Sequence, residues 1–323
     1  MGFCINRIVL IIMAKFYPKN KPYKKGFFDT GDGHSLYYEF CGNPKGKPVV
    51  YLHGGPGAGI NKASRRFFNP KKFNVLLFDQ RGAGKSSPLG SMKNNNTWTL
   101  AEDIKKLLAH FGMKKVFVFG GSWGSTLALV FAIKNPEMVS GMLLRGIFLS
   151  YDGDVRYAFE GPAKELFPEQ VERFLKPVPK SLRKNPFAFY AKKIASKNPA
   201  TRKKFAFAYA SFEQFLLSLE FNEKKAIAKT KKWNFFAGAK IESGYLAKKC
   251  FLQENFILKN AHKLSGIPVT IVHGRYDMVC SPKSALKLHK ALKGSKLFFT
   301  TAGHSASDKE TEARLAEEME KSA

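Results

Sequence analysis

The sequence predicts an α/β protein with a mostly parallel sheet, helices flanking the sheet, and a helical segment inserted into it. Over 27–147, short apolar runs alternate with amphipathic ones, which is typical of strands alternating with helices. Over 148–262, helical spacing rich in Lys, Phe and Ala replaces the strand pattern, and strand-like runs return over 263–323. We therefore expect a sheet domain in two parts with a helical cap domain between them, preceded by an extension at 1–26.

The composition fits a globular protein and limits the classes of function. Apolar residues make up 44% and aromatic residues 14% of the 323 positions, which excludes an intrinsically disordered chain. The formal charge of +29 comes mainly from lysines spread along the chain without a recognition motif. This pattern favours a solvated basic surface and predicts no nucleic-acid site.

The cysteines and the N-terminal residues indicate the cellular compartment of the protein. The four cysteines have neither paired nor metal-ligand spacing, which predicts a reduced cytoplasmic protein without zinc: Cys4, Cys41, Cys250 and Cys280. The apolar run at 8–14 is too short to span a bilayer, so no membrane association is expected. This run fits either a weak export signal or an extension upstream of a natural start at Met13.

The elements of the first half follow in order. Apolar runs predict three strands, and the third is followed by an amphipathic helix. In that helix Thr99 and Glu102 have the spacing of a capping box, and Gly112 can end it. A further strand leads directly into Ser122, a helix ends at Pro136, and one more strand follows. These segments are 35–42, 48–55, 73–82, 97–112, 114–121, 125–136 and 139–149.

The elements after the insertion repeat the same alternation. A strand is expected at 267–277, a helix at 281–294, a strand at 296–304 and a closing helix near 308–321. Strands that alternate with helices pair in parallel, so their carboxyl ends meet at one edge of the sheet.

The segment GGSWG places a serine between two glycines at a junction of strand and helix. Gly120, Ser122 and Gly124 form a Gly-x-Ser-x-Gly motif between the strand at 114–121 and the helix after it. In a nucleophile elbow, a strained turn of this kind lifts the serine hydroxyl above the sheet, where a base and a substrate can reach it. The motif alone is common, so it indicates a nucleophile only where a base and a carboxylate accompany it.

A serine hydroxyl needs a base, and the base needs a carboxylate to orient it. His304 follows the last predicted strand, and Asp277 ends the strand before that one, so both lie at the same sheet edge as Ser122. The order Ser, Asp, His along the chain is that of α/β hydrolases. Four other histidines fall in helices, in an early turn or before a strand, and we expect structural roles for them: His34, His110, His262 and His289.

Backbone N–H groups are needed to stabilise the oxyanion that forms when a serine attacks a carbonyl. The amide of Trp123, directly after the nucleophile, is one candidate donor. Gly55, in the HGGPG segment after a strand, is the second, because a residue without a side chain permits close approach.

Six segments together resemble the proline iminopeptidase family of α/β-hydrolase serine peptidases, and the likeness extends over about 27–306. They are HGGPGAG, FDQRGAGKS, GGSWGSTLAL, LRGIFL, HGRYDMVC and GHSA. The resemblance implies release of an N-terminal proline from peptides, with no metal or organic cofactor. It also implies that the helical insertion is a cap over the active site.

The resemblance implies roles for further residues. Members of this family bind the substrate's cationic amine with two cap glutamates, which match Glu213 and Glu242 here. Positions that line the family's proline pocket match Phe148, Tyr157 and Cys280. Asp79, Gln80 and Arg81 of the DQRG segment are expected to support the loops of the site.

This chain departs from the family pattern near the first glutamate. Tyr209 and Phe212 stand where tryptophans are usual, and Leu246 stands where an aromatic residue is expected. These changes do not affect Ser122, Asp277 and His304, but they predict a less strict preference for proline.

Two other functions remain open at this point. One is an esterase or amidase of the same fold that does not require a free amine. The other is a non-catalytic binding protein of this fold, which the filled triad and oxyanion positions disfavour. The expected partners are peptides with a free N-terminal proline, and the sequence leaves the oligomeric state open.

Overall fold

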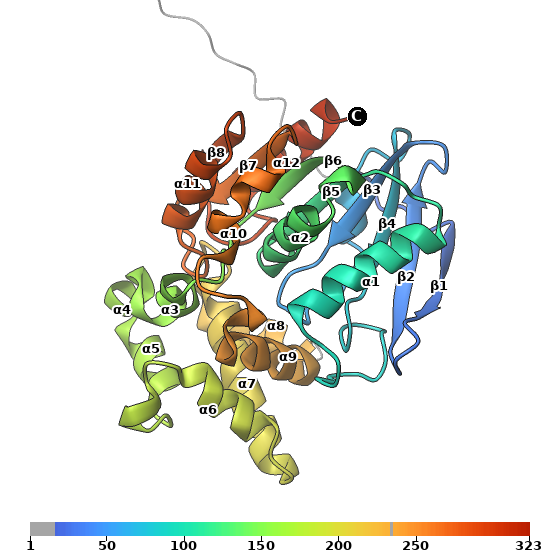
Figure 1. Cartoon of the computed structure of the whole chain (residues 1–323). Coiled ribbons are helices and arrows are strands. Elements are labelled where there is room, and N and C mark those ends of the chain that lie inside the picture. Colours follow the sequence, from blue (N-terminus) through green and yellow to red (C-terminus); the bar gives the residue numbers. More distant parts are fainter. Residues whose placement is uncertain (1–16, 233–234) are drawn as a thin grey trace, which may run out of the picture.

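A single sheet of eight strands organises the molecule in this computed structural model, which describes residues 17–232 and 235–323 (Figure 1). The strand order is β1-β2-β4-β3-β5-β6-β7-β8; β1 and β2 are antiparallel to their neighbours, and the strands from β4 to β8 pair in parallel. The predicted α/β class is confirmed. The strands are β1 Lys24–Asp29, β2 Ser35–Gly42, β3 Lys47–Leu52, β4 Phe73–Phe78, β5 Val116–Gly121, β6 Val139–Arg145, β7 Val269–Gly274 and β8 Lys296–Thr300.

The strand β1 was not expected from the sequence. It begins at Lys24, so the predicted boundary after residue 26 falls inside it. Within the described residues β1 is an edge strand that pairs with β2 alone, and it leaves Lys24, Lys25 and Phe27 exposed. Such a strand lacks the apolar run that marks a buried one. The apolar run at 8–14, with its proposed export or upstream role, lies outside the described residues.

Helices cover both faces of the sheet, because alternate residues of each strand point to opposite sides. Val50, Leu76 and Val118 belong to the apolar core under α1, α2 and α11, and Val75 and Phe117 belong to the core under α12. These four helices are α1 Thr97–His110, α2 Trp123–Lys134, α11 Pro282–Ala291 and α12 Lys309–Lys321.

The first turn of α1 corrects one prediction. The N-cap is Asn96, whose side chain accepts hydrogen bonds from the N–H groups of Trp98 and Thr99, each at 3.0 Å. The predicted capping box of Thr99 and Glu102 is therefore wrong: Thr99 lies inside the helix, and Glu102 forms an ion pair with Lys134. An Asn bonds these N–H groups as a Thr would, so the cap lies three residues before the predicted one and the helix starts at Thr97.

The segment between β6 and β7 is helical over its described residues and lies beside the sheet domain (Figure 1). Its last part, α10 and the short helix after it, packs on α2 and α11 of the sheet domain. The described residues contain no helix that is both long and apolar enough to span a bilayer. The helices are α3 Asp152–Glu160, α4 Pro162–Leu166, α5 Pro168–Leu175, α6 Pro186–Ile194, α7 Pro199–Leu216, α8 Glu223–Lys232, α9 Phe235–Ala247 and α10 Phe256–Lys259.

Candidate active site

The turn between β5 and α2 holds Ser122 in a backbone conformation that few non-glycine residues adopt. Its φ is 58° and its ψ is −128°. The chain is also crowded on both sides: a Cβ at position 120 would lie 2.3 Å from the carbonyl oxygen of Gly124, and one at position 124 would lie 2.2 Å from that of Leu52. Gly120 and Gly124 are therefore required by space, and the turn presents the serine at the carboxyl edge of the sheet.

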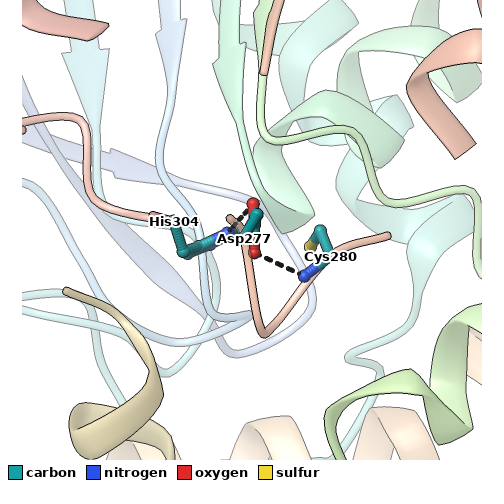
Figure 2. A group of neighbouring side chains, drawn as sticks. All are labelled: Asp277, Cys280 and His304. Atoms are coloured by element: carbon teal, nitrogen blue, oxygen red, sulfur yellow. Dashed lines mark hydrogen bonds and ion pairs between the residues drawn. The ribbon is translucent and has the colours of Figure 1, made fainter. Parts of the chain in front are cut away.

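His304 lies between Ser122 and Asp277. Its Nδ1 is 2.7 Å from Asp277 Oδ2 (Figure 2). Its Nε2 is 3.0 Å from Ser122 Oγ. Burial raises the pKa of Asp277, but the interaction with His304 outweighs burial and the pKa lies below its ordinary value. The ionised carboxylate accepts from Nδ1–H, which leaves Nε2 free to accept the serine proton.

The second oxygen of Asp277 is held by the backbone. Oδ1 accepts hydrogen bonds from the N–H groups of Val279, at 2.9 Å, and Cys280, at 2.8 Å (Figure 2). Tyr157 of α3 donates its hydroxyl to the main-chain carbonyl of Asp277, at 3.2 Å. The carboxylate thus has a fixed orientation, and a cap helix contacts the loop that carries it.

Asp277, Cys280 and His304 also have ligand atoms within 4.8 Å of one another, a spacing that could suit a metal. Burial raises the pKa of the Cys280 thiol well above its ordinary value, so the thiol stays protonated. A metal needs a thiolate and an unprotonated imidazole nitrogen, and Nδ1 of His304 is already bonded to Asp277. The hydrogen bonds of a catalytic triad therefore account for this cluster better than a metal site does.

The two residues expected to supply oxyanion amides lie near Ser122. Trp123 is the first residue of α2, so its N–H has no acceptor within the helix. Gly55 lines the same pocket as Ser122, and its φ of 104° suits glycine. The chain before it runs close to the serine, since a Cβ on Gly54 would lie 3.2 Å from Ser122 Cβ.

A pocket enclosing about 580 Å³ opens above Ser122 between the sheet domain and the cap. Four of the residues expected at the substrate site line it: Phe148, Cys280, Glu213 and Glu242. The three positions that depart from the family pattern line it as well: Tyr209, Phe212 and Leu246. Tyr157 is not part of this lining; it lies behind the loop of Asp277.

Glu213 of α7 and Glu242 of α9 lie close enough to interact inside this mainly apolar pocket. Burial raises the pKa of Glu213 to about 7. Burial, and then the nearby charge of Glu213, raise the pKa of Glu242 well above its ordinary value. Two carboxyl groups in this setting retain a proton between them, and a cationic group can take its place.

Asp154 of α3 is a pocket residue to which the sequence analysis assigned no role. Its carboxyl group accepts from the Leu149 N–H, at 2.6 Å, and from the Ser284 hydroxyl. Burial raises the pKa of Asp154 to about 7. In the sequence it stands among charged residues at a helix start, which is typical of a solvated first turn, so no pattern singles it out.

The DQRG residues lie beside the site. Asp79 accepts hydrogen bonds from the N–H groups of Ile60, at 2.6 Å, and Lys85, at 2.8 Å. Arg81 forms a buried ion pair with Asp103 and also contacts Asp32. The other histidines expected to be structural, His34, His110, His262 and His289, lie outside the lining of the pocket.

Comparisons with known proteins agree with this architecture. A family model described as "alpha/beta hydrolase fold" matches residues 47–311. A proline iminopeptidase of Xylella fastidiosa (strain 9a5c) is 41% identical over 297 residues, covering 91% of this chain and 95% of the relative. A proline iminopeptidase of Arabidopsis thaliana is 40% identical over 309 residues, covering 94% of this chain and 81% of the relative.

Solved structures show the same fold at lower identity. A proline iminopeptidase of Mycobacterium smegmatis has a TM-score of 0.64 at 15% identity, covering 92% of this chain and 98% of its own. An esterase from Exiguobacterium antarcticum has a TM-score of 0.62 at 20% identity, covering 93% and 99%. The family resemblance seen in the six sequence segments is confirmed by the relatives at about 40% identity. The chain therefore belongs to the proline iminopeptidase family, within the α/β hydrolase fold.

Proposed function

We propose that the protein is a serine exopeptidase that releases the N-terminal proline from peptides. The observation that carries this proposal is that Ser122 lines a pocket that also contains the half-buried Glu213 and the buried Glu242. Ser122 attacks the substrate carbonyl and accepts the acyl group, and the two glutamates bind the substrate's cationic amine. The names of the relatives at about 40% identity support the same activity.

The first half of the reaction forms an acyl-enzyme. Ser122 Oγ attacks the carbonyl carbon of the N-terminal residue while His304 Nε2, 3.0 Å away, accepts the hydroxyl proton. Asp277 stabilises the imidazolium, and the N–H groups of Gly55 and Trp123 stabilise the oxyanion. His304 then gives its proton to the leaving amine as the C–N bond breaks.

Water completes the cycle. His304, again neutral, removes a proton from a water molecule, and the resulting hydroxide attacks the acyl carbon. Collapse of this second tetrahedral intermediate breaks the ester bond, and Ser122 recovers its proton from His304. The products are free proline and the shortened peptide.

Binding of the amine limits cleavage to one residue. The free imino group of an N-terminal proline is cationic at neutral pH, and Glu213 and Glu242 offer it a negative charge where water is largely excluded. A longer segment on the amino side of the scissile bond would carry its charge past the glutamates. Phe148 and Cys280 provide apolar surface for the ring.

The cytoplasm is the proposed location. Cys41, Cys250 and Cys280 are free and buried, which suits a reducing compartment.

The deciding experiment compares proline and alanine arylamides, each with a free and an N-acetylated amine, on the wild type and on Ser122→Ala. Cleavage of the free-amine proline substrate alone, lost in the variant, supports the proposal. Equal cleavage of acetylated substrates would indicate an esterase or amidase instead. Absence of turnover together with absence of fluorophosphonate labelling at Ser122 would indicate a binding protein.

A further inference from the structure

His53 is a buried histidine that the reaction described above does not use. It lies at the end of β3, directly before the Gly54-Gly55 segment, with 1% of its surface exposed. Its Nε2 is 3.0 Å from the main-chain nitrogen of Gln80. A backbone N–H can only donate, so Nε2 is the acceptor and carries no proton. Burial lowers the pKa of His53 to about 4, and the ring is neutral at neutral pH.

The single proton of the neutral ring therefore lies on Nδ1. Two groups are close to this atom: the carbonyl oxygen of Gly54, at 2.9 Å, and the N–H of Gly59, at 3.3 Å. A protonated Nδ1 donates to the oxygen and cannot accept from Gly59, so the shorter contact is the hydrogen bond. The carbonyl of Gly54 is fixed by this bond and by a second, longer one from the Ala58 N–H, at 3.3 Å.

The Gly54 carbonyl and the Gly55 N–H belong to one peptide group. This peptide is not among the cis bonds of the described chain. In a planar trans peptide the C=O and the N–H point in opposite directions. A hydrogen bond that holds the carbonyl of Gly54 therefore also sets the direction of the Gly55 N–H, the proposed oxyanion donor.

Gln80 connects this arrangement to the second donor. Its side-chain Nε2 donates to the main-chain oxygen of His53, at 2.9 Å, and its Oε1 accepts from the indole Nε1–H of Trp123, also at 2.9 Å. Trp123 is fully buried, so its ring cannot turn away from this bond without repacking. Through its backbone and its side chain, residue 80 contacts both segments that supply the oxyanion donors.

We propose that His53 and Gln80 are positioning residues that hold the Gly55 and Trp123 amides in the orientation that binds the oxyanion. This inference rests on the proposed function of the two amides and deepens it. Neither side chain touches the substrate; each acts through the backbone. Loss of either one should weaken stabilisation of the tetrahedral intermediate while leaving substrate binding nearly unchanged, because the amine and ring contacts lie elsewhere in the pocket.

The test uses three conservative variants of the full-length protein. Trp123→Phe removes the indole N–H and keeps the backbone amide, Gln80→Met keeps the side-chain length without its hydrogen bonds, and His53→Phe keeps a ring without nitrogens. The matched control is Ser86→Ala, which removes buried hydrogen bonds to Asp79 and Tyr37 in the same loop but contacts neither donor.

We expect kcat for the proline arylamide to fall about tenfold in Trp123→Phe and Gln80→Met and about 100-fold in His53→Phe, with KM changed less than threefold. The rate of fluorophosphonate labelling of Ser122 should fall in parallel, because that reaction also places an oxygen in the hole. Combining Trp123→Phe with Gln80→Met should cost little more than either change alone. Ser86→Ala should keep kcat within threefold.

Two results would overturn the inference. One is a lower melting temperature in the three variants with unchanged kcat and labelling rate, which would mark the residues as structural only. The other is an equal loss of kcat in Ser86→Ala. Labelling of Ser122 does not require peptide cleavage. If the wild type failed to cleave proline substrates, the proposed function would be refuted, but the labelling rates of the variants would still test this inference.

Discussion

The rings of Phe174 and Phe212 stack with their centroids 4.3 Å apart and their planes inclined by 15°. Both residues line the active-site pocket, and both also line a second cavity of about 650 Å³ between α5, α7 and α8. The stacked pair is therefore a wall that separates the active-site pocket, which lies between the sheet domain and the cap, from a second cavity in the cap, and we expect it to limit the depth of the active-site pocket.

Replacing Phe212 with Ala should join the two cavities and widen the range of N-terminal residues that are cleaved. The ratio of kcat/KM for a leucine arylamide to that for the proline arylamide should rise about tenfold, as expected from a few methylene groups of new room. Phe215→Ala is the control, because Phe215 lines only the second cavity. An unchanged ratio in Phe212→Ala would show that the wall does not set specificity.

Asp277→Asn should lower kcat for the proline arylamide by about 10⁴-fold. The amide nitrogen of an asparagine cannot accept the His304 Nδ1–H, so the ring would lose the tautomer in which Nε2 accepts from Ser122. Steady-state kinetics on the purified variant measures this loss, and circular dichroism checks that the fold persists. Asp152→Asn, at an exposed carboxylate at the start of α3, should keep wild-type activity. A loss below tenfold in Asp277→Asn would rule out this role.

The Glu213 and Glu242 pair predicts a pH dependence specific to free-amine substrates. The pKa of Glu213 is raised to about 7, so this carboxyl group is neutral below that pH and negative above it. For the proline arylamide, kcat/KM should therefore rise with pH through about 7 and fall again where the substrate amine loses its proton, near pH 8. An ester substrate without an amine should not show the rise in kcat/KM that the ionisation of Glu213 causes.

Glu213→Gln should remove the rise in kcat/KM near pH 7 that is specific to substrates with a free amine. It should also lower kcat/KM for the proline arylamide about 100-fold, as for other buried charge pairs that lose one partner. Glu220→Gln, at an exposed glutamate shortly after α7, is the matched control and should leave the profile unchanged. An identical pH profile for the amide and ester substrates in the wild type would contradict the proposed amine site.

Gly124→Ala should destabilise the protein by roughly 3 kcal/mol or more, since overpacking against a backbone atom has little room to relax. The new Cβ would lie 2.2 Å from the carbonyl oxygen of Leu52. Gly244→Ala, also within a helix, is the control: its Cβ would meet only the flexible end of Met92, at 2.9 Å. Urea unfolding of both variants compares the two costs. Equal stability would show that the elbow tolerates a side chain.

Much of the fold could be predicted from the sequence, because the central parallel strands β4, β5, β6 and β7 are mostly buried and their apolar runs are continuous. The residues Ser122, Asp277 and His304 could be selected for the same reason: each follows a strand that is easy to find, and the carboxyl ends of parallel strands share one edge. The structure brings these three side chains together.

Other features depend on contacts between distant segments, which no local pattern reveals. The strand β1 is mostly exposed, and the cap of α1 could be assigned to Thr99 as readily as to Asn96. Asp154 of the pocket is hydrogen-bonded to Ser284, 130 positions later in the chain. The wall of Phe174 and Phe212 arises from the packing of two cap helices.

The position of the cap insertion in the chain has a consequence for biosynthesis. Ser122 and His304 are separated by 182 residues. At a synthesis rate of roughly 5–20 residues per second, Ser122, the proposed nucleophile, leaves the ribosome about 10–40 s before His304, its proposed base. During that interval the nascent chain carries an unactivated serine, so it cannot cleave the amino termini of neighbouring nascent chains. Activity begins only when the C-terminal strands have been made and have joined the sheet.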